Sequence, residues 1–109
     1  MNYRLTIPPN TVEGTPIYAS YDIGRGVIRE MVVSIPDGHK DLARLNVKTR
    51  GKILVPEFGS GEIWIRGNNA RLVISPVTPI VLDGPPYEIT LWGWNEDDTY
   101  EHTFTVEVS

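Results

Sequence analysis

Apolar and polar residues alternate along most of this chain, and proline or glycine breaks the alternation at short intervals. In the last stretch, 99–108, every second side chain from Tyr100 to Val108 is a ring or an aliphatic group, and those between are Glu or Thr. A repeat of two residues places successive side chains on opposite faces of a strand, with one face buried. The pattern therefore predicts an all-β chain.

Ten short stretches carry this alternation between turn residues. The predicted strands are 2–7, 15–23, 27–35, 42–50, 53–55, 62–66, 70–75, 78–82, 87–95 and 99–108. Eight to ten short strands in 109 residues predict an antiparallel, jelly-roll-like β-sandwich, with a small closed barrel as the alternative. We expect a single domain over residues 1–109. Residues 1–12 are expected to form an edge strand or an extended arm, because Pro8 and Pro9 cannot donate to a ladder.

Two pairs of strands look like hairpins from their spacing alone. The Gly24-Arg25-Gly26 turn predicts a hairpin between 15–23 and 27–35, with Val27 facing inward. The acidic tip 96–98 predicts a second hairpin between 87–95 and 99–108, the most secure of the chain.

Charge and composition narrow the functional classes. The net charge of −4 argues against a nucleic-acid partner, which normally needs a basic surface. No stretch approaches the roughly 18 apolar residues of a membrane span, and residues 1–7 read as a strand rather than a secretory signal. The absence of cysteine excludes disulfides and thiolate metal sites. We therefore expect a soluble protein made in its mature form, with no membrane partner and no cofactor.

The charges are unevenly distributed along the chain. Residues 1–71 hold ten basic and seven acidic groups, a balance of +3, whereas residues 72–109 hold seven acidic groups and no Lys or Arg. Interleaving of strands in a sandwich would average this asymmetry in space. Alternatively, complementary patches would steer subunits together.

A conflict of faces marks the strand 87–95. If Ile89 and Leu91 point into the core, Trp92 and Trp94 both point outward, and Gly93 between them leaves room for a close approach. Three interpretations are open. The indoles anchor a subunit interface, they form a stacking platform for a sugar, or a bulge turns both into the core.

The strand 42–50 carries three of the ten basic side chains of the chain. Its inner face is apolar, and its outer face carries Arg44, Lys48 and Arg50 together with Asn46. We predict that this outer face is either solvated or meets something acidic, and that the three basic residues face the acidic surface of a partner. Together with Trp92, Trp94 and Tyr100, the three basic residues form the predicted interface.

No motif in the chain indicates catalysis, so we expect a protein that is not an enzyme. Asp97 and Asp98 are weak metal candidates, because calcium needs six to eight oxygen ligands and their loop lacks the usual pattern. A solvated tip is the simpler interpretation of that loop. His39 lies in a turn, and His102 on the apolar side of the last strand reads as a core or interface histidine with one satisfied nitrogen.

Three segments resemble small β proteins of tailed phages and related viral sequences. They are Ile7-Pro8-Pro9-Asn10-Thr11, Trp64-Ile65-Arg66-Gly67-Asn68 and Gly93-Trp94-Asn95-Glu96-Asp97-Asp98-Thr99-Tyr100-Glu101-His102. The resemblance spans nearly the whole chain, but its motifs are turns and strands, and no functional residue carries over from it. It implies a virion component such as a capsid decoration protein, a small spike or a head–tail accessory.

The resulting expectation is a non-enzymatic structural protein of a phage particle, assembled in the host cytoplasm. It would self-associate, with a trimer as one expected form, and bind the major capsid protein or another virion protein. The alternative is a carbohydrate-binding or adhesion module that uses Trp92 and Trp94 as its stacking platform.

Overall fold

The computed structural model describes residues 2–36, 38, 42–49, 52–55, 64–75, 80–82 and 87–109. These residues form ten strands. The strands are β1 (Asn2–Ile7), β2 (Ile17–Asp22), β3 (Gly26–Ile28), β4 (Met31–Ile35), β5 (Ala43–Thr49), β6 (Lys52–Val55), β7 (Ala70–Ile74), β8 (Ile80–Leu82), β9 (Glu88–Asn95) and β10 (His102–Val108).

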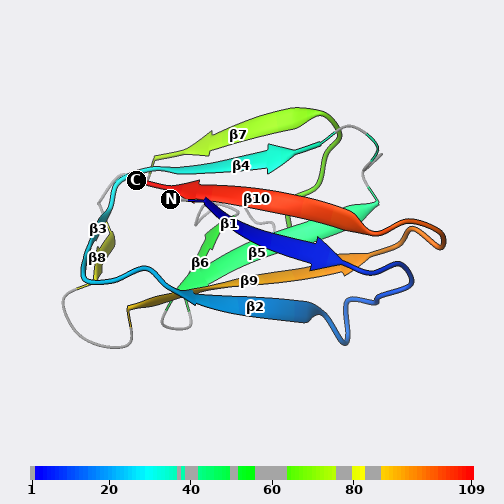
Figure 1. Ribbon diagram of the computed structural model, residues 1–109, viewed down its shortest axis with the longest axis horizontal. Coiled ribbons are helices and arrows are strands. Elements are labelled where there is room, and N and C mark those ends of the chain that lie inside the picture. Colours follow the sequence, from blue (N-terminus) through cyan, green and yellow to red (C-terminus); the bar gives the residue numbers. More distant parts are fainter. Residues whose placement is uncertain are drawn as a thin grey trace.

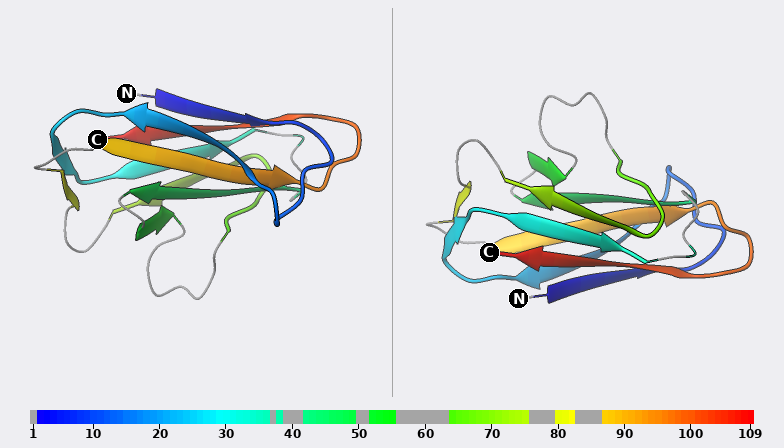
Figure 2. Two further views of the ribbon diagram at one scale, coloured as in Figure 1. Left: turned by 90° about the horizontal axis from the view of Figure 1, so that it is seen from below. Right: turned by 90° about the horizontal axis from the view of Figure 1, so that it is seen from above.

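Eight of these strands build two antiparallel sheets that lie face to face (Figures 1 and 2). Sheet A has the order β1-β10-β4-β7, and sheet B has the order β2-β9-β5-β6, while β3 and β8 form a separate two-stranded ribbon. The chain crosses between the sheets after β1, β4, β6 and β9. It also crosses through the ribbon, by way of β3 between β2 and β4 and of β8 between β7 and β9, and this is jelly-roll topology. The prediction of an all-β, jelly-roll-like sandwich is confirmed, and two separate sheets replace the barrel alternative.

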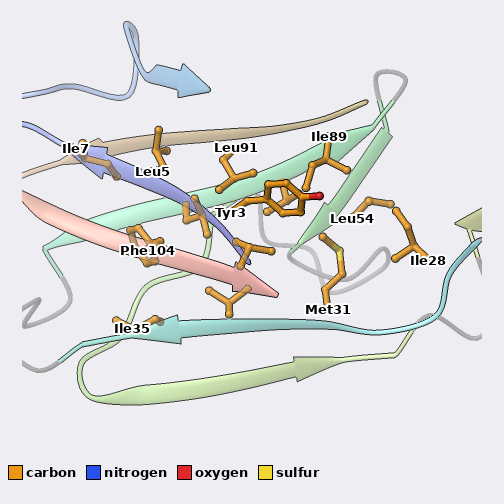
Figure 3. Packing of buried hydrophobic residues seen from close by; sticks show 14 of the residues in the cluster. Tyr3, Leu5, Ile7, Ile28, Met31, Ile35, Leu54, Ile89, Leu91 and Phe104 are labelled. Atoms are coloured by element: carbon orange, nitrogen blue, oxygen red, sulfur yellow. The ribbon is translucent and has the colours of Figure 1, made fainter. Parts of the chain in front are cut away.

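The core forms where the inner faces of the two sheets meet. Every second residue of β1 is buried, and the same period appears in β9 and β10. Figure 3 shows Leu5 and Ile7 of β1 together with Leu91 of β9 and Phe104 of β10 in this layer. Each such side chain stabilises the fold by about 1.5–3 kcal/mol through its removal from water.

The first strand lies at the edge of sheet A, as the prolines that follow it predicted. β1 pairs only with β10, with Leu5 opposite Phe104. Its other side is partly covered, because the hydroxyl of Tyr21 donates a hydrogen bond to the carbonyl oxygen of Arg4.

The hairpin predicted around Gly24-Arg25-Gly26 is wrong. β2 pairs with β9 in sheet B, whereas the chain after the turn enters the β3–β8 ribbon and then sheet A. The predicted strand 27–35 is also divided, since the main chain of Arg29 and Glu30 bonds to Ser109 instead of continuing a strand. This break reverses the inner face, so Ile28 is buried and Val27 is exposed.

The predicted hairpin of the last two strands is wrong as well, because β9 and β10 belong to opposite sheets. The side chain of Asn95 is fully buried at the point where the chain leaves sheet B. Its amide donates to the carbonyl oxygens of Ile7 at 3.3 Å and Tyr100 at 3.0 Å, and its oxygen accepts the amide of Asp97 at 2.9 Å. These bonds hold residues 96–101 as a bridge between the two layers.

Gly93 provides the close approach that its position between two tryptophans suggested. A Cβ atom at this residue would lie 2.8 Å from the carbonyl oxygen of Arg44 and 3.1 Å from Cδ2 of Leu5, and it would overlap the end of Ile7. Gly93 faces the core, so the missing side chain lets β1 of sheet A pack directly onto β9 of sheet B.

Replacing Gly93 with alanine is expected to destabilise the sandwich by about 1–3 kcal/mol, because the added methyl group overpacks a filled core and meets a main-chain oxygen. Urea unfolding followed by circular dichroism measures the change. The matched control is Gly26→Ala, also in a strand, where a Cβ meets no atom within 4 Å. The control should shift the free energy of unfolding by less than about 1 kcal/mol. Equal stability of both variants would contradict the packing role of Gly93.

Candidate functional site

The outer surface of sheet B carries all three tryptophans of the chain and two cations. Ile89 and Leu91 of β9 are fully buried, so Trp92 and Trp94 point to the opposite, outer side, where each is partly exposed. The prediction that the two indoles share the outer face is confirmed, and the alternative of a bulge that buries both is wrong. We call the surface formed by Tyr18, Trp64, Trp92 and Trp94 the aromatic face.

The most accessible part of the aromatic face is a pair of stacked rings. Tyr18 of β2 lies directly opposite Trp92, and their ring centroids are 4.7 Å apart at an interplanar angle of 30°. Tyr18 is 63% exposed, a high value for a tyrosine within a sheet. On the other side of Trp92, Nζ of Lys48 lies 5.1 Å from the indole centroid, within the range of a cation–π contact.

Trp94 occupies the more enclosed part of the aromatic face. The guanidinium carbon of Arg44 lies 4.9 Å from its ring centroid, and Trp64 meets it edge to face at 6.2 Å. Main-chain bonds between Leu45 and Ile65 hold the Trp64 segment beside β5. The indole Nε1 of Trp64 donates a 2.7 Å hydrogen bond to the carboxylate of Glu13.

The basic strand β5 is less open to solvent than predicted. Arg44 is only 8% exposed and lies 3.4 Å from the carboxylate of Glu96, while Asn46 is almost fully buried. Arg44 thus meets an acidic group, as expected, but that group belongs to the same chain, and Trp94 covers the guanidinium on its other side. Lys48 is partly exposed and makes no ion pair with the described residues. Arg50 lies outside the described residues.

Tyr100 does not belong to the aromatic face. It is 69% exposed and lies in the bridge between the sheets, before β10 of sheet A begins. Among the described rings, none contacts Tyr100, whereas Trp92 and Trp94 both have aromatic neighbours. The predicted grouping of Tyr100 with the two indoles is therefore not found in the fold.

The acidic bridge is an ordered turn whose residues 96 and 98–100 are exposed, so it is a solvated tip as expected, although it joins two sheets instead of closing a hairpin. Asp97 Oδ1 accepts the main-chain amides of Thr99 at 2.9 Å and Tyr100 at 3.2 Å, and Oδ2 lies 2.8 Å from His102 Nε2. The Thr99 amide, followed by the His102 ring, lowers the pKa of the Asp97 carboxyl from its usual value of 3.8. Asp98 is exposed and accepts the Thr99 hydroxyl at 2.8 Å.

His102 is buried on the core side of β10, and its Nε2 is satisfied by Asp97, in agreement with the expected core histidine. His39 lies outside the described residues. Within the part of the chain that is described, no group of three His, Asp or Glu side chains is placed to hold a metal ion, and no helix is long and apolar enough to cross a membrane.

The sequence gives no indication that Tyr18 and Trp64 belong to the aromatic face, or that Glu13 accepts the hydrogen bond of Trp64. Only cross-strand register and the fold of the first loop bring them to β9. The alternation of β2 does put Tyr18 on the outer face, which is the one signal that sequence offers.

Compared with known proteins, the chain matches no family model, no curated protein and no solved structure. The functional argument therefore depends on the geometry of the aromatic face. Stacked and partly exposed rings with an adjacent cation are suited to binding through contact, and the arrangement lacks a nucleophile paired with a base in the described residues.

Asp97→Asn is expected to make the free energy of unfolding less dependent on pH in the acid range. Because the folded pKa of Asp97 is lowered, its ionised form contributes stability above pH 3.8, and that contribution is lost as the pH falls through the folded pKa. Urea unfolding at a series of acidic pH values measures the slope. The control Asp98→Asn removes the same charge from a carboxylate that accepts no main-chain amide among the described residues. An undiminished slope in Asp97→Asn would exclude this role.

Proposed function

We propose that the protein is a non-enzymatic structural protein of a tailed-phage virion, of the capsid decoration or accessory type. It self-associates and binds the capsid lattice, and the aromatic face is its contact surface. The observation that carries the proposal is the exposed Tyr18 ring stacked on Trp92 beside Lys48.

The chemistry of this surface favours a protein partner. Tyrosine, tryptophan and arginine are the residues that most often dominate binding energy at protein interfaces. Lys48 has no carboxylate partner among the described residues, so an acidic group on the partner would be paired by it. Jelly rolls are frequent in capsid proteins, which is an analogy of fold and adds only a modest argument.

The absence of an enzymatic role is part of the proposal. The Nε2 atom of His102 contacts the carboxylate of Asp97, and the guanidinium group of Arg44 lies between Trp94 and Glu96. The described polar groups of the aromatic face thus serve to position rings and cations. Such an arrangement supports binding to a partner rather than the making or breaking of covalent bonds.

The proposal predicts that Tyr18→Ala weakens both self-association and binding to purified phage capsids by at least about tenfold, equivalent to the loss of about 1.4 kcal/mol. Light scattering after size exclusion and capsid co-sedimentation measure the two effects. Tyr100→Ala is the matched control, since this tyrosine is equally exposed but lies away from the aromatic face. Equal effects of the two variants, or none from Tyr18→Ala, would overturn the assignment of the surface.

Association is also expected to weaken as salt rises, because Lys48 is partly exposed and an ion pair with a partner would be screened. Lys48→Met should remove that dependence while keeping much of the apolar stem. Association that is indifferent to salt in the original protein would remove the electrostatic part of the proposal.

A glycan is the second candidate ligand, and the same stacked pair favours it. Flat aromatic rings suit the apolar faces of pyranose sugars, and Tyr18 and Trp92 present such rings on an open sheet. This candidate predicts a monomer whose tryptophan fluorescence is quenched by soluble glycans, with the quenching lost in Tyr18→Ala. A glycan screen without quenching, alongside capsid binding, would exclude it in favour of the structural role.

A further inference from the structure

β2 forms one outer edge of sheet B, and its hydrogen-bonding pattern determines which main-chain groups lie there (Figure 1). Ile23 donates its amide to the carbonyl oxygen of Tyr87 at 2.8 Å, and this pair continues the register in which Tyr21 lies opposite Ile89. Bonded and non-bonded pairs alternate in an antiparallel ladder. The odd-numbered residues of β2 therefore bond to β9, and the even-numbered residues direct their N–H and C=O groups away from it.

Three consecutive even-numbered residues, Tyr18, Ser20 and Asp22, thus present their main-chain donors and acceptors at the edge. We call these groups the β2 edge. Within the described residues, no hydrogen bond reaches them, although the side chains of Ser20 and Asp22 are bonded to Thr90 and Gly24.

The β2 edge also lacks the features that normally protect an edge strand. The strand contains no lysine, no proline and no bulge, and its register against β9 is continuous. The edge of β1 in sheet A differs, because the Tyr21 hydroxyl occupies the carbonyl oxygen of Arg4. The β1 edge is partly covered by the chain itself, whereas no described residue covers the β2 edge, which is suited to strand addition.

We propose that the β2 edge pairs antiparallel with the β2 edge of a second copy of this chain, about a two-fold axis at Ser20. The inference rests on the proposed self-association and names the surface that starts it. In this register Ser20 faces Ser20 of the second copy, and Tyr18 faces Asp22 in both directions. All three even-numbered residues then exchange both main-chain bonds, and the two copies of sheet B form one continuous sheet.

Self-complementarity argues for a second copy as the occupant. A two-fold axis requires a surface that matches itself, and the β2 edge offers equal numbers of donors and acceptors in a symmetric order. Antiparallel pairing separates the two Asp22 carboxylates and sets each opposite a Tyr18 hydroxyl, so no like charges meet. A shift by two residues toward the start of the strand would place Pro16, which has no N–H group, opposite Asp22. The Ser20-centred register is therefore the favoured one.

The pairing would also extend the aromatic face. Tyr18 stacks on Trp92 within each copy and lies near the shared edge. Two such pairs would then lie on one side of the continuous sheet, which doubles the surface available to a capsid lattice.

Ser20→Pro tests the proposal, because it removes the central N–H group that the dimer uses and that β9 does not use. Proline is tolerated in an edge strand when its nitrogen faces solvent. Light scattering should show the mass fall from twice the chain mass of 12.2 kDa to a single chain. The matched control Ser20→Ala removes only the hydroxyl contact with Thr90 and should stay dimeric. A dimeric, folded Ser20→Pro variant would overturn the proposal.

The register is tested by crosslinking in a chain that has no cysteine of its own. Ser20→Cys should form a disulfide-linked dimer under mild oxidation, since opposite residues in a ladder lie about 5.5 Å apart between Cα atoms. Asp22→Cys should not, because the two positions would lie several residues apart along the joined strands. Efficient crosslinking by Asp22→Cys alone would exclude the Ser20-centred register.

Amide exchange of the unmodified protein separates this inference from the proposed function. If the β2 edge pairs, the N–H groups of Tyr18, Ser20 and Asp22 become protected as concentration rises. Association without protection of these amides would overturn the strand pairing and leave self-association through the aromatic face intact. Loss of capsid binding in Tyr18→Ala with strand pairing retained would place the capsid contact on the aromatic face alone. A monomer at all concentrations would overturn the pairing.

Discussion

The close contact between β1 and β9 at Gly93 is the constraint on which the sandwich depends. A side chain at this position would overlap Ile7 and press on the main chain of Arg44, so the two sheets could not approach to their present separation. Gly93 lies between Trp92 and Trp94, which the two-residue period of β9 places on the outer face. A single glycine thereby sets how closely the two sheets pack where β1 meets β9.

The second structural requirement is that the chain leaves each sheet at the right place. Asn95 ends β9 by bonding to Ile7 and Tyr100, and it also connects to the first loop, where the hydroxyl of Thr11 accepts the Asn95 amide at 2.7 Å. Asp97 continues this network through Thr99 and His102. The loop after β1 and the bridge after β9 are consequently one polar unit, which holds one end of the sandwich closed. The Asp97 carboxylate accepts two main-chain amides and lies beside the His102 ring, so it works as a structural acceptor within this unit.

Sheet B offers two distinct surfaces on neighbouring strands. Its outer face presents stacked rings and a partly exposed cation, whereas its β2 edge presents main-chain groups that no described residue bonds. A sheet face binds a partner through the shape and charge of its side chains, whereas a sheet edge binds a partner strand through main-chain hydrogen bonds. Their proximity at Tyr18 suggests that pairing of chains and binding to a lattice would reinforce each other, since each pairing doubles the number of contacts.

The alternation of apolar and polar residues determined the all-β fold class. It also determined the inner faces of β1, β9 and β10 and the outward position of Trp92 and Trp94. These are local properties, because a period of two fixes which side of a strand is apolar whatever its neighbours are. The sequence did not determine which strands pair. Both predicted hairpins were wrong, because a turn of the same composition can join two strands of one sheet or connect strands of two different sheets. Other features depend on the register between distant segments. They are the burial of Arg44, the separation of Tyr100 from the indoles, and the position of Tyr18 and Trp64 beside the indoles. Only the tertiary structure decided them, because they arise from which strands lie side by side and not from the pattern within any one strand.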